Sequence, residues 1–573
     1  MTDPIANTIT LTVTAAIDGF KPLDVTAVVT LEPETAPEPP EPTPPPDEDT
    51  APLCVRIDYD GASYVYDEVL GVDLGDYCEP SGHFTQRCVL CVLPDLVGFR
   101  VLFRRDRGEA QRDEVVFELG DTTAGTVAAN MTGYIATILR GPTTLATVDV
   151  PEHYWYSRWR WQSAPRPIIA NVEDLQAAGL LPCFDPALSQ TRPLSSAKTY
   201  EPMGLAGLTA YMASTGERDE IGLVTEAQAE YLRGETPVDS LMAQAEASGT
   251  MPWHYRDEDG GAVFNFIEHP QATLYYPANI PACSTPITLD VAHEPDLCYV
   301  PFLLTGDPYY LEELQFAATY NVLASGPQQR FSYCIGFAVR AHAWALRTLA
   351  HCARATPDDA PAWVQSRAYW QEWMDGEREW MLGRYVNATA APFTELPYAV
   401  LHYMADTQNS PASSSMPPGC VSQQWMEDYE SVVLGHVVQI GYADWLPILE
   451  WKLVNSLART NGTSGWIRAK PCPYNVALRP SASAPCVTSW QESWDLNLQM
   501  QPGIGVYDDP DTMPAGDSLV YASYTLSALA LSAALGVEGA TECYTWLRGQ
   551  LVANSDANTY SDRKWSFACV TSH

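Results

Sequence analysis

The first 31 residues alternate between apolar and polar positions. From Ile9 to Ile17 nearly every second residue is apolar with threonines between, and the same period of two resumes over residues 23–31 after an Asp-Gly pair. This pattern predicts two strands joined by a tight turn. A lone hairpin is marginal in water, so we expect this arm, residues 1–32, to pair with the body of the protein or with a neighbouring subunit.

A proline-rich, acidic segment follows the arm. Residues 33–52 contain nine prolines and six acidic residues. Proline favours the extended polyproline conformation, and the like charges repel one another. The segment therefore predicts a semi-rigid linker and a domain boundary.

Short alternating runs between turn residues continue the chain. They are Val55–Tyr59, Phe99–Phe103, Val115–Phe117 and Thr144–Val148. Several short strands at such a spacing predict a β-sandwich domain over residues 53–164. Near its end, residues 154–161 are rich in aromatic residues and arginine. We interpret them as a plug between domains or as a segment that stacks on glycans.

The periodicity becomes helical over residues 165–573. The helical segments are 202–215, 219–233, 238–248, 296–304, 308–324, 331–354, 361–384, 396–406, 421–440, 442–459, 518–535 and 538–552. Many of them are apolar almost all round, which fits paired helices in a closed α/α toroid better than an open solenoid. We therefore predict a multidomain α+β protein with a β-hairpin arm, a β-sandwich and a large all-α toroid.

The charge balance narrows the choice of partners. The formal net charge of -39 repels phosphate backbones and anionic membranes, so we predict no nucleic-acid partner. The most apolar stretch, residues 519–535, is interrupted by tyrosines and serines. It is typical of a buried helix, and we predict no membrane insertion.

The compartment is inferred from two further features of the composition. The start of the chain lacks the basic and apolar regions of a secretory signal, and 14 cysteines are many for a cytosolic protein without a clear metal motif. A protein that is assembled in a reducing cytoplasm and later released by lysis would have many thiols and would need no secretory signal. We therefore expect a bacteriophage virion protein, located in the virion or outside the cell after lysis.

The first candidate site is a loop dense in reactive side chains. Trp253, His254, Tyr255, Arg256 and Asp257 are consecutive. Such residues can stack on a sugar, move protons and pair with a carboxylate. The alternative is a loop whose aromatic residues close the core and whose charges are solvated.

The second candidate lies at the start of a predicted helix. Pro295 suits the first helical position, which places His293 at the helix mouth and Tyr299 about one turn inside. There His293 can act as a base and Tyr299 as an acid. The alternative is that His293 is an ordinary capping residue.

Two helical stripes supply further candidates. Arg340 begins the first stripe, and offsets of three and four residues define the faces. The substrate-binding candidates in and beside these stripes are Trp344, Trp425, Glu427, Asp428 and His436. The alternative is packing of aromatic and polar side chains between helices.

Metal and cofactor signals are sparse. Cys88 and Cys91 form a single C-x-x-C pair, and with Cys54 and Cys78 they can make a four-thiolate zinc site or two disulfides. The sequence contains no phosphate-binding loop, dinucleotide motif or zinc-protease helix. We predict no cofactor, and no metal in the candidate site.

Two of these motifs resemble segments of a known group of proteins. They are residues 253–257 and the pattern Asp290-x-x-His293-x-Pro295-x-Leu297-x-Tyr299, followed by Leu304-Thr305-Gly306-Asp307-x-Tyr309-Tyr310-Leu311-Glu312-Glu313-Leu314. Here the chain resembles predicted bacterial and phage proteins with a β-sandwich and an α/α toroid. That layout is similar to exo-rhamnogalacturonan lyase-like and other toroidal polysaccharide lyases, and it covers roughly residues 53–550. Glu294 stands where this pattern leads us to expect Gln.

The resemblance implies a β-elimination at a uronic acid. One group neutralises the sugar carboxylate, a base removes the C5 proton and an acid protonates the leaving oxygen. We assign these roles, in that order, to Arg256 or Arg340, to His254 or His293, and to Tyr255 or Tyr299. A hydrolase of the same fold would use two carboxylates, Asp257 with Glu427 or Asp428.

The expected partners follow from this interpretation. They are a host surface polysaccharide and, through the arm, other virion subunits. The sequence is also compatible with a homo-oligomer. The alternative function is a noncatalytic virion structural or decoration protein that retains a carbohydrate-enzyme fold. A glycan-binding adhesin is a third hypothesis, and it predicts saturable binding without cleavage.

Overall fold

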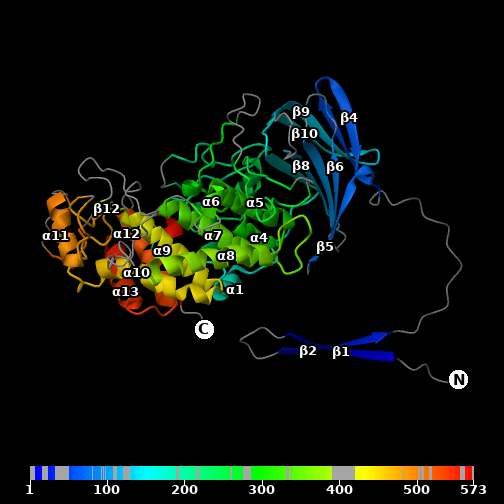
Figure 1. The fold of residues 1–573 in the computed structure, drawn as a ribbon. Coiled ribbons are helices and arrows are strands. Elements are labelled where there is room, and N and C mark those ends of the chain that lie inside the picture. Colours follow the sequence, from blue (N-terminus) through cyan, green and yellow to red (C-terminus); the bar gives the residue numbers. More distant parts are fainter. Residues whose placement is uncertain are drawn as a thin grey trace. The chain divides into compact units, whose positions relative to one another are not determined.

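The computed structural model divides the chain into two compact units, Met1–Ala51 and Pro52–His573. The residues it describes are 7–15, 23–31, 51–79, 82–91, 93, 96, 98–106, 112–120, 129–188, 193–214, 218–257, 261–274, 285–330, 335–336, 338–389, 420–481, 483–500, 504, 507, 509–514, 519–554 and 562–570. Figure 1 shows the elements in chain order, with the strands of residues 53–162 in blue and cyan and most helices in green to red.

The first unit contains an antiparallel pair of strands, β1 (Asn7–Ala15) and β2 (Leu23–Leu31). The register places Ile9 opposite Val29, so apolar positions face apolar positions across the pair. This confirms the strand pairing predicted from the alternation. The acidic linker, apart from its last two residues, lies outside the described part of the chain.

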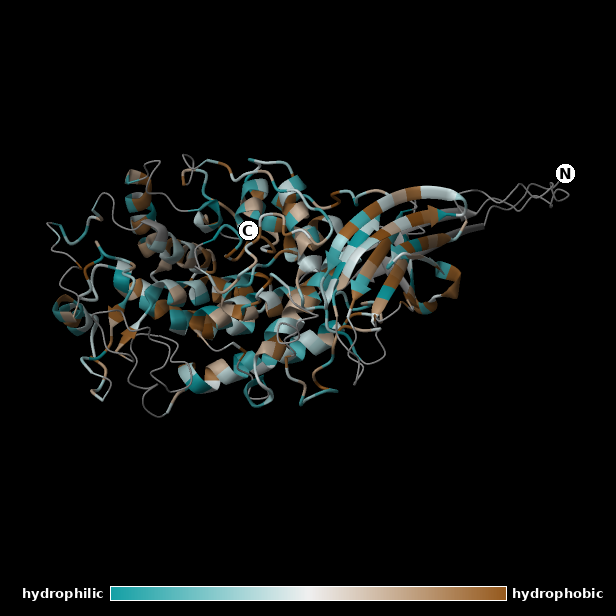
Figure 2. Ribbon diagram, turned by 90° about the horizontal axis from the view of Figure 1, so that it is seen from above, coloured by the Kyte–Doolittle hydropathy of each residue, from teal (hydrophilic) through white to brown (hydrophobic). Residues whose placement is uncertain are grey.

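The N-terminal part of the second unit contains two antiparallel sheets. Their strands are β3 (Leu53–Tyr59), β4 (Ala62–Asp67), β5 (Val72–Glu79), β6 (Gly82–Leu90), β7 (Phe99–Asp106), β8 (Asp113–Leu119), β9 (Met131–Arg140), β10 (Thr143–His153) and β11 (Ser157–Gln162). One sheet has the order β10-β9-β3-β4 and the other β11-β8-β7-β6-β5. The four predicted runs fall in β3, β7, β8 and β10. In Figure 2, polar and apolar residues alternate along these strands, as expected for strands with two different faces.

Strand β11 is buried on both faces, and this joins the sheets to the helices. Trp159 stacks on Phe117 of β8, with 4.2 Å between the ring centroids. Arg158 and Arg160 alternate with it and pair with acidic residues of the helical part, among them Asp307. The aromatic and arginine-rich segment thus lies between the sheet and the helices.

Helices make up most of the remaining chain. They are α1 (Val172–Ala177), α2 (Glu226–Leu232), α3 (Asp239–Ala247), α4 (Tyr299–Thr305), α5 (Pro308–Ala324), α6 (Pro327–Arg330), α7 (Val339–Ala355), α8 (Arg367–Met381), α9 (Gln424–Gln439), α10 (Leu446–Thr460), α11 (Trp490–Met500), α12 (Leu519–Ala534) and α13 (Ala540–Ala553). A short strand pair, β12 (Val421–Ser422) with β13 (Val476–Ala477), lies among them. Sheets in the N-terminal part and helices in the C-terminal part confirm the α+β organisation.

One predicted helix is wrong, and another lies outside the described residues. Residues 202–214 form turns instead of the helix predicted over 202–215. Met203 and Ala206 adopt positive φ there, 64° and 46°, which a right-handed helix does not allow. The helix predicted over 396–406 falls outside the described residues. Helices α1, α6 and α11 were not predicted.

Helices α7, α9 and α12 run parallel to one another. Near their starts, Arg340 of α7 lies over the ring of Trp425 of α9, at 5.2 Å from its centroid. Eleven positions further on in each helix, His351 and His436 bring their Nε2 atoms to 2.9 Å. Trp425 also contacts Tyr521 near the start of α12, with ring centroids 6.5 Å apart. The N-terminal ends of the three helices therefore lie together at one end of the bundle.

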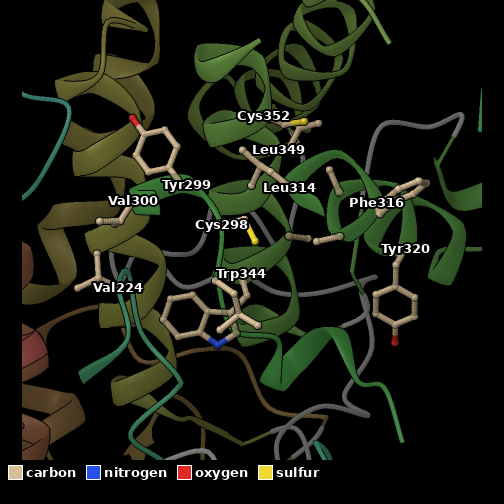
Figure 3. Close-up of a cluster of buried hydrophobic side chains, with 14 of the residues drawn as sticks. Val224, Cys298, Tyr299, Val300, Leu314, Phe316, Tyr320, Trp344, Leu349 and Cys352 are labelled. Carbon is tan, nitrogen blue, oxygen red and sulfur yellow. The ribbon is translucent and has the colours of Figure 1, made fainter. Parts of the chain in front are cut away.

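A hydrophobic core extends through sheets and helices of the second unit. The same cluster of buried side chains includes Phe117 of β8, Leu314 of α5 and Leu349 of α7. Figure 3 shows part of it, with Cys298 among Leu314, Trp344 and Leu349, and Phe316 further to the right. This continuous core fixes the helix ends that carry the candidate site.

Candidate functional site

An aspartate–histidine pair lies just before α4. The Asp290 carboxylate accepts a hydrogen bond from the backbone N–H of Ala292 (3.1 Å), which caps a short 3-10 turn. Its other oxygen lies 2.5 Å from Nδ1 of His293. Because an ionised carboxylate can only accept, Nδ1 carries the proton and Nε2 presents a lone pair. Among the described residues, no hydrogen bond engages Nε2.

The surroundings keep this imidazole neutral. Burial lowers the pKa of His293; the hydrogen bond that Nδ1 donates to Asp290 opposes the change, and the Arg340 guanidinium adds to it. The pKa of Asp290 is lowered, because the bonds from His293 and Ala292 outweigh burial. A neutral imidazole held by a carboxylate has the arrangement of a general base.

Arg340 is the cation of this site. It is the second residue of α7, and its guanidinium lies on the face of Trp425. Within the described part of the chain, no hydrogen bond or ion pair holds the guanidinium, and its Nε atom is buried without a partner. Burial lowers the pKa of Arg340, because the charge is only partly compensated. Such a group favours an anionic ligand that would complete its hydrogen bonds.

Aromatic rings form a wall beside Arg340. Trp425 contacts Tyr474 and Tyr521, with ring centroids 5.9 and 6.5 Å apart. Tyr474 and Tyr521 are themselves 5.8 Å apart and nearly perpendicular. Trp425 is buried, whereas 46% of Tyr474 is exposed, so the wall reaches solvent there. Rings of this kind can stack on the apolar face of a sugar.

The helix dipoles add to the positive potential. The parallel helices α7, α9 and α12 begin at this end, close to Arg340, Trp425 and Tyr521. Each helix N-terminus carries a partial positive charge and backbone N–H groups without partners inside the helix. In a chain with a net charge of -39, this is a locally cationic place. We call the set Asp290, His293, Arg340, Trp425 and Tyr474 the mouth cluster.

Three residues of this cluster are functional candidates already in the sequence. His293, Arg340 and Trp425 come from three separate segments of the chain, and the structure brings them together. Asp290 was noted only as part of a motif, and Tyr474 was missed. Tyr474 lies in the segment between α10 and α11, where no periodic pattern marks it. Only its position against Trp425 reveals it.

The consecutive residues from Trp253 to Asp257 lie elsewhere, between the sheets and α5. His254 is buried, with Nε2 3.0 Å from a Glu313 oxygen. Arg256 is buried too, and its two bonds to Glu118 measure 2.7 and 2.8 Å. A substrate carboxylate cannot reach Arg256 in this arrangement, so we leave the segment out of the candidate site.

The other three residues of this segment also have partners inside the protein. Trp253 and Tyr255 are buried in the hydrophobic core. Asp257 is half-buried and accepts a hydrogen bond from the backbone N–H of Asn265 (2.9 Å). The geometry of the segment is that of a connection that closes the core.

Tyr299 and His436 belong to a buried chain of polar groups. Nδ1 of His351 lies 2.5 Å from an Asp296 oxygen, and its other nitrogen meets His436. The ring of Tyr299 stacks on His351, with centroids 3.7 Å apart. All four residues are buried, at the opposite end of α7 and α9 from the mouth cluster. This separates Tyr299 from His293.

The remaining candidates on α7 and α9 are buried between helices. Glu427 pairs with Lys452, and Asp428 with Arg459 at 2.6 Å. Trp344 packs on Tyr429 and on Trp565. These contacts connect α9 to α10 and to α7, and α7 to the C-terminal segment. The two carboxylates are thus fully engaged in the interior, away from solvent.

The structure contains no metal site among the residues it describes. In this part of the chain, no group of three or more His, Cys, Asp and Glu side chains is placed to hold an ion. Cys54, Cys88 and Cys91 are free thiols, and Cys54 donates to Asp67 at 3.3 Å. The Cys78 side chain lies outside the description.

Comparison with known proteins gives no further guide. No protein-family model, no curated protein and no solved structure matches this chain. Of the helices described, none is both long and apolar enough to cross a membrane. The function must therefore be argued from the geometry of the mouth cluster.

Proposed function

We propose that the protein binds an acidic polysaccharide at the mouth cluster and cleaves it by β-elimination. One observation carries the proposal. The guanidinium of Arg340 lies over the ring of Trp425 and acts electrostatically on Asp290 and His293, and it has no hydrogen-bonding partner among the described residues. A uronate unit offers both a carboxylate for this cation and an apolar ring face for the aromatic wall.

The groups of the cluster can divide the reaction among them. Arg340 neutralises the uronate carboxylate, which makes the C5 proton more acidic. Nε2 of His293 takes that proton, and the C–H electron pair forms the C4=C5 double bond as the C4–O bond breaks. The leaving oxygen needs a proton, and the hydroxyl of the partly exposed Tyr474 can supply it. Asp290 holds the imidazole in the reactive tautomer and stabilises it once protonated.

The overall charge of the chain does not prevent an anionic substrate. A net charge of -39 repels a polyanion at long range, but salt screens this repulsion beyond about 10 Å at 0.1 M. Within that distance the guanidinium and the helix N-termini of the cluster determine the potential. Moderate salt should therefore assist binding before high salt weakens it.

We further propose the finer architecture expected from the sequence. The two antiparallel sheets would form a sandwich, and the helices would close into an α/α toroid. Support for the toroid comes from the parallel course of α7, α9 and α12. Support also comes from α10, which runs antiparallel to α9: it follows α9 after a short connection, and Arg459 near its end pairs with Asp428 near the start of α9. A toroid alternates inner and outer helices in this way.

A test of the function uses the full chain and a panel of polyuronates and bacterial surface polysaccharides. Ultraviolet absorbance of the unsaturated product measures β-elimination, and quenching of tryptophan fluorescence measures binding. We expect His293→Asn to lose cleavage by at least about a hundredfold while binding persists. Arg340→Gln should weaken binding by at least tenfold, because a buried charge-assisted contact is lost.

Matched controls separate the cluster from general effects. His269→Asn changes a half-buried histidine near Asp257, and Arg56→Gln changes an exposed arginine. Both should act like the unmodified protein. Cleavage that survives His293→Asn and Arg340→Gln would refute the proposal. Binding without cleavage in the unmodified protein would instead support a glycan-binding protein.

One observation favours the noncatalytic alternative. Many of the residues that the sequence marks as reactive, such as His254 and Arg256, are buried in ion pairs and serve the core. A virion structural or decoration protein that retains a carbohydrate-enzyme fold would have this character. The setting in a bacteriophage virion, or outside the cell after lysis, remains our proposal from the sequence alone. If no polysaccharide of the panel is bound or cleaved, the result would favour the structural role.

A further inference from the structure

An exposed tyrosine, Tyr211, lies on a segment that adjoins the mouth cluster and has no part in the proposed reaction. Tyr211 forms a parallel bridge with Thr288, and Thr288 lies two residues before Asp290. The backbone N–H of Met212 donates to the Thr288 carbonyl at 3.0 Å. The segment that carries Tyr211 therefore runs beside the chain that leads to Asp290.

The register of this bridge determines the side on which Tyr211 lies. Residues that are opposite one another in a strand pair share a face, and so do residues two apart along an extended chain. Tyr211 therefore shares a face with Thr288, and Thr288 shares it with Asp290, whose backbone is extended. Burial agrees with this alternation. Tyr211 is 56% exposed and Thr288 is exposed too, whereas the neighbouring Met212 and Ile287 are buried.

Arg218 holds this segment in place. Its guanidinium donates through Nη1 to the carbonyl of Met212 and to the hydroxyl of Ser214, both at 2.9 Å. The same guanidinium acts on the mouth cluster. Burial, and to a smaller extent the charge of Arg218, lowers the pKa of both His293 and Arg340. The segment of Tyr211 is thus fixed by a group within electrostatic reach of the cluster.

We propose that Tyr211 forms a second sugar subsite, where its ring stacks on the unit next to the uronate that Arg340 binds. An exposed tyrosine offers an apolar ring face to the C–H groups of a sugar. Tyr211 adjoins the Asp290 side of the mouth cluster, whereas Tyr474 adjoins the Trp425 side. Stacking needs only a ring face, so the second unit can be neutral or acidic. The inference rests on the proposed function and specifies an oligosaccharide rather than a single uronate as the ligand.

The subsite predicts that binding depends on the length of the ligand. A monomeric uronate contacts Arg340 alone, whereas a longer oligomer also covers Tyr211, and two linked contacts strengthen binding together. We expect Tyr211→Ala to raise the dissociation constant of a hexamer at least about fivefold, because the stacking contact is lost. The dissociation constant of the monomer should stay unchanged.

Tryptophan fluorescence of the full chain measures these constants. The ligands are galacturonate, glucuronate, mannuronate and guluronate, each as the monomer and as the hexamer. Tyr211→Phe keeps the ring and should bind the hexamers like the unmodified protein. Val65→Ala truncates a similarly exposed side chain on the N-terminal sheets and should have no effect. Circular dichroism should find all three variants folded, because the substituted side chains are exposed.

The possible outcomes separate the subsite from the proposed function. If the unmodified protein binds none of these monomers and hexamers, the uronate site is absent and the subsite fails with it. If hexamers bind equally well to the unmodified protein and to Tyr211→Ala, only the subsite is overturned. An equal loss for monomer and hexamer would also overturn it, because Tyr211 would then act on the site of Arg340 itself. A loss in Tyr211→Phe as large as in Tyr211→Ala would exclude stacking on the ring.

Discussion

The carboxyl group of Glu294 is fully buried beside His293 of the mouth cluster. Burial raises the pKa of Glu294 to about 8, and the guanidinium of Arg347 and the amide of Asn321 oppose this only in part. At neutral pH the group is therefore a neutral acid with the shape of a glutamine side chain. Gln is the residue that the lyase-like pattern leads us to expect at this position. A neutral Glu294 in its place differs little from Gln in charge or size.

Replacing Glu294 with glutamine should stabilise the protein in a pH-dependent way. In the unfolded chain the carboxyl ionises near its ordinary pKa of about 4.3, whereas in the folded chain it stays neutral up to about 8. Folding stability of the unmodified protein therefore falls as the pH rises through this window. Glu294→Gln removes that loss, so its stability advantage should grow to a few kcal/mol by pH 8 and then level off.

Urea unfolding at intervals between pH 4.5 and 9 measures this advantage. Glu268→Gln, at an exposed glutamate, serves as the matched control and should show no such growth. An advantage of Glu294→Gln that is independent of pH would contradict the assigned protonation state. Activity of Glu294→Gln near neutral pH should equal that of the unmodified protein, because the neutral acid and the amide leave His293 in the same place.

At the scale of elements, His342 connects three helices. This residue of α7 lies between Glu377 of α8 and Glu430 of α9, with nitrogen–oxygen distances of 3.2 and 2.9 Å. Burial alone would lower the pKa of His342, but the two carboxylates outweigh it and raise the pKa well above the ordinary value. A charged imidazole thus holds two carboxylates in the interior, where neither would be stable without it.

His342→Gln should destabilise the protein by about 3–5 kcal/mol, because two buried carboxylates lose their counter-charge. The sign of the pH dependence follows from the raised pKa. The stabilisation by His342 is complete below its unfolded pKa near 6.5 and is lost as the pH rises through the higher folded value. The difference between the two proteins in urea unfolding should therefore be largest near pH 6. Adding Glu430→Gln to His342→Gln should recover part of the loss; a further loss would argue against this explanation.

The elements also mark the limit of what the sequence can predict. Helix α5 begins and ends where the sequence predicts, because its signals are local: Asp307 caps the first turn and Pro308 takes the first position. The pairing of Arg256 with Glu118 joins residues 138 positions apart, and no local pattern predicts it. The sequence shows that Arg256 can bind a carboxylate, but not that the carboxylate belongs to the same chain.

The same limit applies to the candidate site. The residue types of His293, Arg340 and Trp425 predict binding of an acidic sugar, and Arg340 and Trp425 lie in helices that the sequence predicts. The predicted helix mouth at His293 is wrong: His293 ends a 3-10 turn, and α4 begins only at Tyr299. The proximity of His293, Arg340 and Trp425 depends on the parallel packing of α7 and α9, which is a tertiary property. Tyr474 has no helical or strand pattern around it, so only tertiary packing could identify it.

At the scale of the whole second unit, a buried ionic network joins the sheets to the helices. Arg158 of β11 pairs with Glu312 at 2.9 Å and with Glu313 at 2.5 Å. Glu313 also contacts His254, and burial, which would raise the pKa of Glu313, is outweighed so that the pKa falls to about 2. Arg104 of β7 reaches Glu312 as well. The network lies within a continuous core, so sheets and helices should unfold together.

Arg158→Leu tests this coupling. The change removes the main counter-charge of buried Glu313 and one of three cations beside buried Glu312, so we expect a loss of about 3–5 kcal/mol in the free energy of unfolding. Arg56→Leu, at an exposed pair with Asp58, should cost at most about 1 kcal/mol. Scanning calorimetry of the full chain should give one main transition for residues 52–573. In Arg158→Leu this transition should move to lower temperature and broaden or divide, because the sheets lose the ion pairs of Arg158 with Glu312 and Glu313 of α5. Two separate transitions in the unmodified protein would show that sheets and helices are independent, and would reduce the network to a local contact.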